Sequence, residues 1–170
     1  GKTETWMIRP QLLWRLGDSA EILVRYEHGS VTGDGPSSQN HPGLANLLPP
    51  VASTNVFFSV PQDSFGLSID YIGLYDSSWD AVSAEINIDV GETGRITNIF
   101  GWRKSSGLTQ SDIDGTPFWL FHADSDNDFE QISNEIRYAG RFWDRMDATI
   151  GFYYFDDTKT YQETRYLLGG

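Results

Sequence analysis

The sequence predicts an all-β fold, namely an antiparallel up-and-down segment of a transmembrane β-barrel with about six to eight long strands, short periplasmic turns and long extracellular loops. Three observations predict it. Apolar and polar residues alternate along several segments that are longer than ordinary globular strands. Short turns and long polar connections alternate between these segments. No stretch has a helical or heptad period.

The first predicted strand covers residues 3–16 and contains Pro10, which donates no ladder hydrogen bond. A short turn at residues 17–19 leads to a second strand over residues 20–30. The long connection that follows, residues 31–78, is rich in Gly, Pro, Ser and Asn at its start. We expect residues 64–75 to be an ordered β segment inside that outer loop, because counting them as a membrane strand breaks the alternation of turns and loops.

The clearest strand is the stretch AVSAEINIDV, residues 81–90, in which every second residue is apolar. Because successive side chains of a strand point to opposite faces, it has one apolar and one polar face. The apolar face meets lipid in an outer-membrane barrel and packs on a core in a soluble β-sandwich, so this stretch alone leaves both interpretations open.

The remaining elements follow the same pattern. GETG, residues 91–94, predicts a tight turn before a strand over residues 95–106. The polar stretch 107–127 predicts a long loop, and EQISNEIRYAGRF resumes the alternation. WDR, residues 143–145, predicts the turn before a last strand that contains Ala148, Ile150, Phe152 and Tyr154 in one phase.

Composition narrows the class of protein. No run approaches the roughly 18 apolar residues of a transmembrane helix, which excludes a helical membrane protein. The net charge of -12 argues against a nucleic-acid partner, because phosphate contacts need basic patches. The absence of Cys excludes disulfides, zinc–thiolate sites and a Cys nucleophile.

Aromatic residues make up 14% of the sequence. They fall near strand ends: Trp6, Tyr26, Trp102 and Tyr154 towards the long loops, and Trp14 and Trp143 towards the short turns. Two aromatic girdles around an apolar band have this distribution. Aromatic residues that cap a sandwich core are the alternative.

Several segments together resemble the middle of the barrel domain of TonB-dependent outer-membrane receptors. They are IRPQLLWRLGDSAEILVRYEHGSVTGDGP, AEINIDVGETGRITNIFGWR, IDGTPFWLFH and EQISNEIRYAGRFWDRMDATIGFYYF. The resemblance covers nearly the whole chain in order. It implies a barrel of about 22 strands with a plugged lumen, and import of ferric siderophores, cobalamin or oligosaccharides across the outer membrane, powered by the TonB complex acting on the plug.

Residues 1–170 show no plug domain, no TonB box and no aromatic-ended C-terminal strand. We therefore expect a partial barrel that supplies wall and extracellular loops, in contact with outer-membrane lipid and with a small-molecule ligand such as a ferric siderophore. The expected ligand-binding residues of the outer loops are His41, Trp119, Phe121 and His122. The expected lumen-facing residues are Glu85, Asn87, Asp89, Gln131, Ser133, Glu135 and Arg137.

No enzyme, cofactor or metal site is expected. His28, His41 and His122 have no partner at ligand spacing, and the Ser residues form no nucleophile motif. Asp124, Asp126, Asp128 and Glu135 approach a calcium-loop spacing, but Phe129 replaces its essential Gly, so a solvated acidic loop fits better. The alternative function is a soluble, lectin-like β-sandwich in which Trp119 and Trp102 stack on sugar rings.

Overall fold

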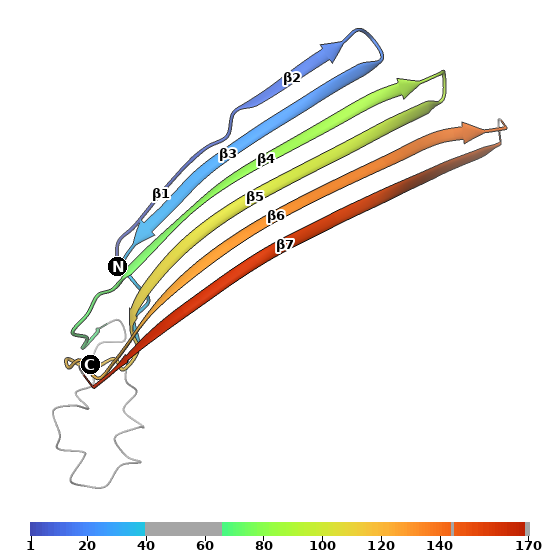
Figure 1. Ribbon diagram of the computed structural model, residues 1–170. Helices are drawn as coiled ribbons and strands as arrows, with labels where there is room; N and C mark the ends of the chain where they lie inside the picture. The colour runs from blue at the N-terminus through green and yellow to red at the C-terminus, as the bar shows by residue number, and fades with distance from the viewer. Residues whose placement is uncertain (40–65, 144, 169–170) are drawn as a thin grey trace.

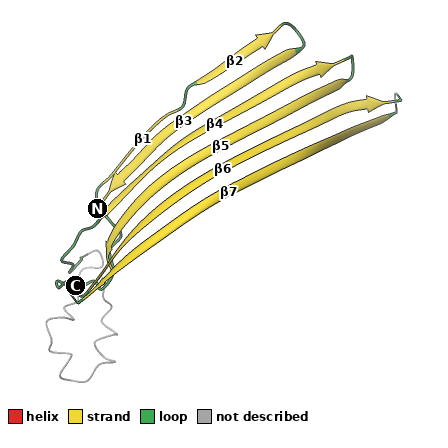
Figure 2. Cartoon of the chain, in the orientation of Figure 1, coloured by secondary structure: helices red, strands yellow, loops and turns green. Residues whose placement is uncertain are grey.

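The computed structural model describes residues 1–39, 66–143 and 145–168, and they form a single antiparallel sheet (Figures 1 and 2). Among these residues no helix is long and apolar enough to cross a membrane. The sheet has seven strands: β1 (Thr3–Ile8), β2 (Gln11–Leu16), β3 (Ala20–Gly33), β4 (Leu74–Val90), β5 (Gly94–Asp112), β6 (Phe121–Phe142) and β7 (Met146–Leu167). The predicted all-β, up-and-down arrangement is thus confirmed.

Each strand from β3 to β6 pairs with the next one along the chain, and β1 and β2 both pair with β3. The first predicted strand is divided in two at Arg9 and Pro10, because Pro10 donates no ladder bond. Its carbonyl still accepts the Tyr26 backbone N–H at 3.1 Å. The sheet is long, curved and open, with β1 and β2 along one edge and β7 along the other (Figure 1).

The turns lie at the end of the sheet where apolar residues prevail. Gly17 and Gly91 have φ values of 67° and 63°, a left-handed conformation that glycine adopts without a Cβ clash. Trp143 adopts φ 52° in the third turn. These turns confirm the short connections that the sequence predicts between β2 and β3, β4 and β5, and β6 and β7.

Two predicted segments differ from the structure. The predicted loop 107–127 is wrong in extent, because β5 continues to Asp112 and β6 begins at Phe121, which leaves a connection of residues 113–120. The acidic residues Asp124, Asp126 and Asp128 therefore lie in β6 rather than in a loop.

The β segment expected at residues 64–75 is also wrong. Its described residues before Leu74 form no strand, and Leu74 and Tyr75 begin β4. Gly73 has φ 73°, which turns the chain sharply into β4. The segment instead packs against the ends of β5 and β6.

Register divides the side chains between two faces. Ile88, Ile96, Tyr138 and Ile150 are paired across β4 to β7 and form one row. Val82, Trp102 and Ile132 form another row closer to the long connections. Beyond it, Asp80, Lys104, Glu130 and Thr158 form the first polar row of the same face. This face of the sheet is thus apolar near the turns and polar towards the long connections.

The described residues have almost no apolar core. Ala123 is their one buried hydrophobic residue, whereas Ile136, Phe152 and Ile150 are 47%, 68% and 73% exposed. A soluble domain of this size buries most of its aliphatic side chains. The apolar side chains of this sheet need a partner outside the described residues.

Candidate functional site

One face of the sheet carries an apolar band, which extends from the row of Val82 to the row of Val90. Along β4 this is about nine residues, within the roughly 9–11 that a tilted strand needs to cross a membrane. Four consecutive apolar residues of β4 on this face pair with Tyr26, Val24, Ile22 and Ala20 of β3. The band is therefore continuous across strands as well as along them.

Polar atoms mark the border of the band on the side of the long connections. Tyr26 donates its hydroxyl to Asp80 at 2.5 Å, and Trp102 donates its indole N–H to Glu130 at 3.0 Å. Both acceptors lie one row farther from the band. The rings thus rest on the band while their polar atoms point away from it, as aromatic side chains do at a membrane interface.

The opposite border is marked by Tyr138. A Cβ added to Gly94 or Gly140 would lie 2.5 or 2.7 Å from its hydroxyl oxygen, so the ring covers these glycines towards the turns. Phe142 contacts Tyr138 edge-on at 6.1 Å between ring centroids. This aromatic pair lies at the turn end of the band.

Within the described residues, one pair of amides lies inside the band, and Asp156 lies at its border on β7. Asn98 donates its side-chain N–H to the Asn134 side-chain oxygen at 3.0 Å and to the backbone oxygen of Glu135 at 2.9 Å. Because each amide has a partner, the pair carries little of the cost of an unpaired polar group in apolar surroundings.

The opposite face along the same rows is mainly polar, although Leu23, Ile99 and Tyr153 share the row of Glu85. Arg95 bonds Asp89 at 2.9 Å, and Asn87 donates to Glu85 at 2.9 Å while accepting from Thr97 at 2.8 Å. Register also places there all the residues predicted to face the lumen: Glu85, Asn87, Asp89, Gln131, Ser133, Glu135 and Arg137. Whether water or a plug meets this face stays a prediction.

A second candidate site lies at the other end of the strands, where residues 66–73 and 113–120 fold over β5 and β6. The connection 113–120 is held by its own carboxylates. Asp114 accepts the backbone N–H groups of Thr116 at 2.9 Å and Phe121 at 2.7 Å. Asp112 accepts the Gly115 N–H at 2.8 Å, and Gly115 has φ 62°. The sequence IDGTP thus folds as a turn braced by aspartates.

Residues 66–73 dock against the end of β5. A Cβ on Gly73 would lie 2.1 Å from the Gln110 carbonyl oxygen, so only glycine allows this approach. Tyr71 donates its hydroxyl to Gln110 Oε1 at 3.0 Å. Burial, with the nearby Asp124 carboxylate, raises the pKa of Tyr71, which keeps its hydroxyl protonated.

His122 stands at the centre of this end. Its imidazole stacks between the rings of Tyr71 and Trp119, with centroid separations of 5.2 and 5.0 Å. Its Nε2 lies 2.9 Å from Asp70 Oδ1. The side chains of Asp70, Tyr71, Trp119, His122, Asp124 and Tyr166 line a cavity of about 330 Å³. Aromatic walls with a few polar atoms are typical of small-molecule sites.

Asp112 lies behind this cavity and is 1% exposed. Burial raises the pKa of Asp112 above its usual range. The Gly115 N–H opposes this rise, and the carboxylates of Asp114 and Asp70 add to it. The protonated form of Asp112 is therefore more favoured than in an exposed aspartate.

The structure brings together two of the predicted ligand-binding residues, Trp119 and His122. Phe121 is adjacent to His122 in β6, so its side chain belongs to the opposite face of the strand. His41 lies outside the described residues. About 33 Å of β5 separates Trp102 from Asp112, the register partner of His122, so the two tryptophans of the sugar-binding alternative do not share a site.

Sequence reasoning missed Asp70, Tyr71 and Asp112. Asp70 and Tyr71 fall in a segment interpreted as a strand, and Asp112 in a stretch interpreted as a loop. They become neighbours only because residues 66–73 dock on the ends of β5 and β6. No family model matches the sequence, and no curated protein matches it.

Proposed function

We propose that this chain forms wall and extracellular loops of an outer-membrane, TonB-dependent receptor for active uptake of a scarce nutrient. The observation that carries the proposal is the apolar band. Its aliphatic side chains are open to the surroundings, and aromatic rings with outward-directed polar atoms bound it on both sides. In the proposed arrangement the band meets lipid, and the polar face meets the lumen.

Strand length supports the same orientation. β6 and β7 have 22 residues each, about twice what a membrane strand needs. Above the border row both faces of β5 and β6 are mainly polar, which suits strands that project into water beyond the membrane. The cavity around His122 then lies on the extracellular side.

The resemblance in sequence and the cavity support the receptor part of the proposal. The cavity offers the faces of Tyr71, Trp119 and Tyr166 together with the carboxylate of Asp124. Ferric siderophores, cobalamin and oligosaccharides all present surfaces that stack on aromatic rings. We propose that Trp119 and His122 contact the ligand, and that the TonB complex drives its entry through a plug elsewhere in the receptor.

Quenching of site-specific labels tests the orientation in membranes. The chain contains no Cys, so single Cys substitutions carry one fluorophore each. We expect brominated lipid to quench a label at Ile86 and a water-soluble quencher to reach Glu85. Asp80 shares the face of Ile86 but lies beyond the border row, so its label serves as a matched control that water should reach. A label at Ile86 shielded from both quenchers would instead favour a β-sandwich core.

Uptake by cells that lack the protein tests the receptor function. We expect loss of TonB-dependent uptake of one labelled ligand class among ferric siderophores, cobalamin and oligosaccharides. The Trp119→Ala variant should weaken binding of that ligand, whereas Trp143→Ala, at a turn on the other end, should not. Equal uptake of all three classes by deleted and parental cells contradicts the receptor proposal.

A further inference from the structure

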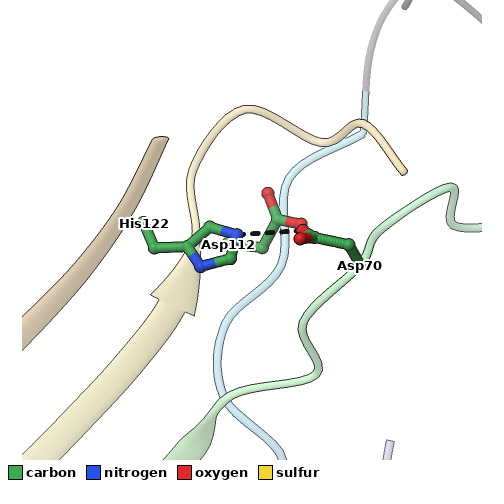
Figure 3. Close-up of side chains that lie close together, drawn as sticks. All are labelled: Asp70, Asp112 and His122. Atoms are coloured by element: carbon green, nitrogen blue, oxygen red, sulfur yellow. Dashed lines mark hydrogen bonds and ion pairs between the residues drawn. The ribbon is translucent and has the colours of Figure 1, made fainter. Parts of the chain in front are cut away.

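Three potential metal ligands converge at the end of the sheet. Asp70 belongs to the segment that docks on β5, Asp112 ends β5, and His122 is the second residue of β6. One carboxylate oxygen of each aspartate and one imidazole nitrogen all lie within 4.8 Å of one another. In Figure 3 the two carboxylates point towards each other, with the His122 ring beside them.

Asp112 carries a buried oxygen that points to a further ligand at this cluster. Its Oδ1 accepts the Gly115 N–H, but its Oδ2 is buried and has no hydrogen-bond partner among the residues that the structure describes. An ionised carboxylate that is 1% exposed and faces a second carboxylate is unfavourable unless a proton or a metal cation lies between them. Asp70 Oδ1 lies 2.9 Å from His122 Nε2, and the Asp70 carboxylate also faces Asp112, so one cation between the three side chains would contact all of them.

We propose that Asp70, Asp112 and His122 bind one divalent transition-metal ion, for which Zn²⁺ is the best match. Zn²⁺ takes imidazole nitrogen and carboxylate oxygen at about 2.0–2.2 Å, which places tetrahedral ligand atoms roughly 3.4 Å apart. His122 Nε2 and Asp70 Oδ1 are 2.9 Å apart, a hydrogen-bond distance, so the two atoms separate by about 0.5 Å to reach that spacing. Ca²⁺ fits poorly, because it takes six to eight oxygen ligands.

The residues around the three ligands favour binding of the ion and leave it accessible to water. The stacked rings of Tyr71 and Trp119 hold the plane of the His122 imidazole. The Asp70 side chain is 22% exposed and lines the cavity, which leaves a side from which water can complete the coordination. Two carboxylates and a neutral imidazole balance the charge of the ion.

The ion would act as a clasp between residues 66–73 and the ends of β5 and β6. It joins Asp70, next to Tyr71 of the cavity wall, to Asp112 and His122 of the sheet. This inference goes beyond nutrient uptake and does not depend on it. A zinc clasp can stabilise this end of the sheet whatever ligand the cavity binds.

Zinc content tests the proposal. The complete protein that contains this chain is purified in detergent, dialysed against Zn²⁺ and analysed by elemental mass spectrometry. We expect the Asp112→Asn and His122→Gln variants each to retain one ion per chain fewer than the parent, and zinc affinity to fall by more than about tenfold. Asp70 lies outside the strands, so Asp70→Asn should leave the sheet intact. We expect this variant to lose the same ion.

His28→Gln is the matched control. His28 Nδ1 lies 2.9 Å from Asp80 Oδ1, the same spacing as in the His122–Asp70 pair, but both side chains are more exposed. This variant should retain the parental zinc content. X-ray absorption at the zinc edge should show one histidine and carboxylate oxygens around the ion in the parent. Equal zinc content in the parent, Asp112→Asn and Asp70→Asn overturns the proposal, as does equal loss in His28→Gln.

Discussion

Ile86→Arg places a charge at the centre of the apolar band. Ile86 lies four residues from both Val82 and Val90, about 13 Å along β4 at roughly 3.3 Å per residue. With strands tilted by about 40°, that is a depth of about 10 Å from either border. Arg at the midplane of a membrane barrel costs about 2–4 kcal/mol, and near the interface about 0–1 kcal/mol. We therefore expect Ile86→Arg to destabilise the protein by about 2–4 kcal/mol and Val82→Arg by about 1 kcal/mol or less.

The assay is chemical unfolding of the complete protein in lipid vesicles, followed by tryptophan fluorescence. Asn87→Arg, one residue away on the polar face, is the control and should change the free energy of unfolding less than Ile86→Arg. A soluble surface tolerates such changes within about 0.5 kcal/mol, whereas a protein core penalises Arg at Val82 as strongly as at Ile86. Either result, in place of a cost that falls towards the border row, would refute a lipid-facing band.

Three further predictions concern close contacts. Asn98→Leu should cost about 0.5–1.5 kcal/mol because it leaves Asn134 unpaired, while the double variant with Asn134→Leu should regain parental stability in the same unfolding assay. Gly29→Ala should lower the free energy of unfolding by about 1–3 kcal/mol, because its Cβ would lie 2.3 Å from the Trp79 ring. That ring is held in place by the hydrogen bond that its N–H donates to Glu27. Gly107→Ala is the control, because the nearest atom to its added Cβ is 3.5 Å away. Gly73→Ala should release residues 66–72, seen as faster hydrogen exchange there, because its Cβ would lie 2.1 Å from the Gln110 carbonyl oxygen. Gly91→Ala has a similar positive φ and no such contact, so unchanged exchange in Gly73→Ala, or equal change in Gly91→Ala, would contradict the docking role.

Alternation located the strands wherever one face is apolar. Residues 81–90 and the run from Ile132 to Tyr138 were predicted as strands for this reason, and both lie inside longer strands. Beyond the border row the signal disappears, because Thr109, Gln110 and Ser111 are polar on both faces although β5 continues. The sequence therefore predicted a loop where the hydrogen-bonded ladder persists.

The segment at residues 64–75 failed for the opposite reason. Its apolar residues alternate like those of a strand, but Tyr71 packs on His122 and Gly73 turns the chain. Trp119 and His122 were predicted from their shared stretch of sequence. Asp70 is 52 positions from His122, and no local pattern connects them. The contact between Asp70 and His122 depends on how residues 66–73 fold over the end of β6.

The two edges of the sheet differ as templates for strand addition. β7 presents one uninterrupted run of 22 residues, and no described strand pairs with its outer side. The other edge consists of two runs of six residues separated at Arg9 and Pro10. In lipid the free backbone groups of an edge must find partners, because water is absent. A neighbouring strand can form an unbroken ladder of hydrogen bonds with β7, whereas a strand that pairs with β1 and β2 loses ladder bonds at Pro10. β7 is therefore the edge along which an added strand can pair without interruption.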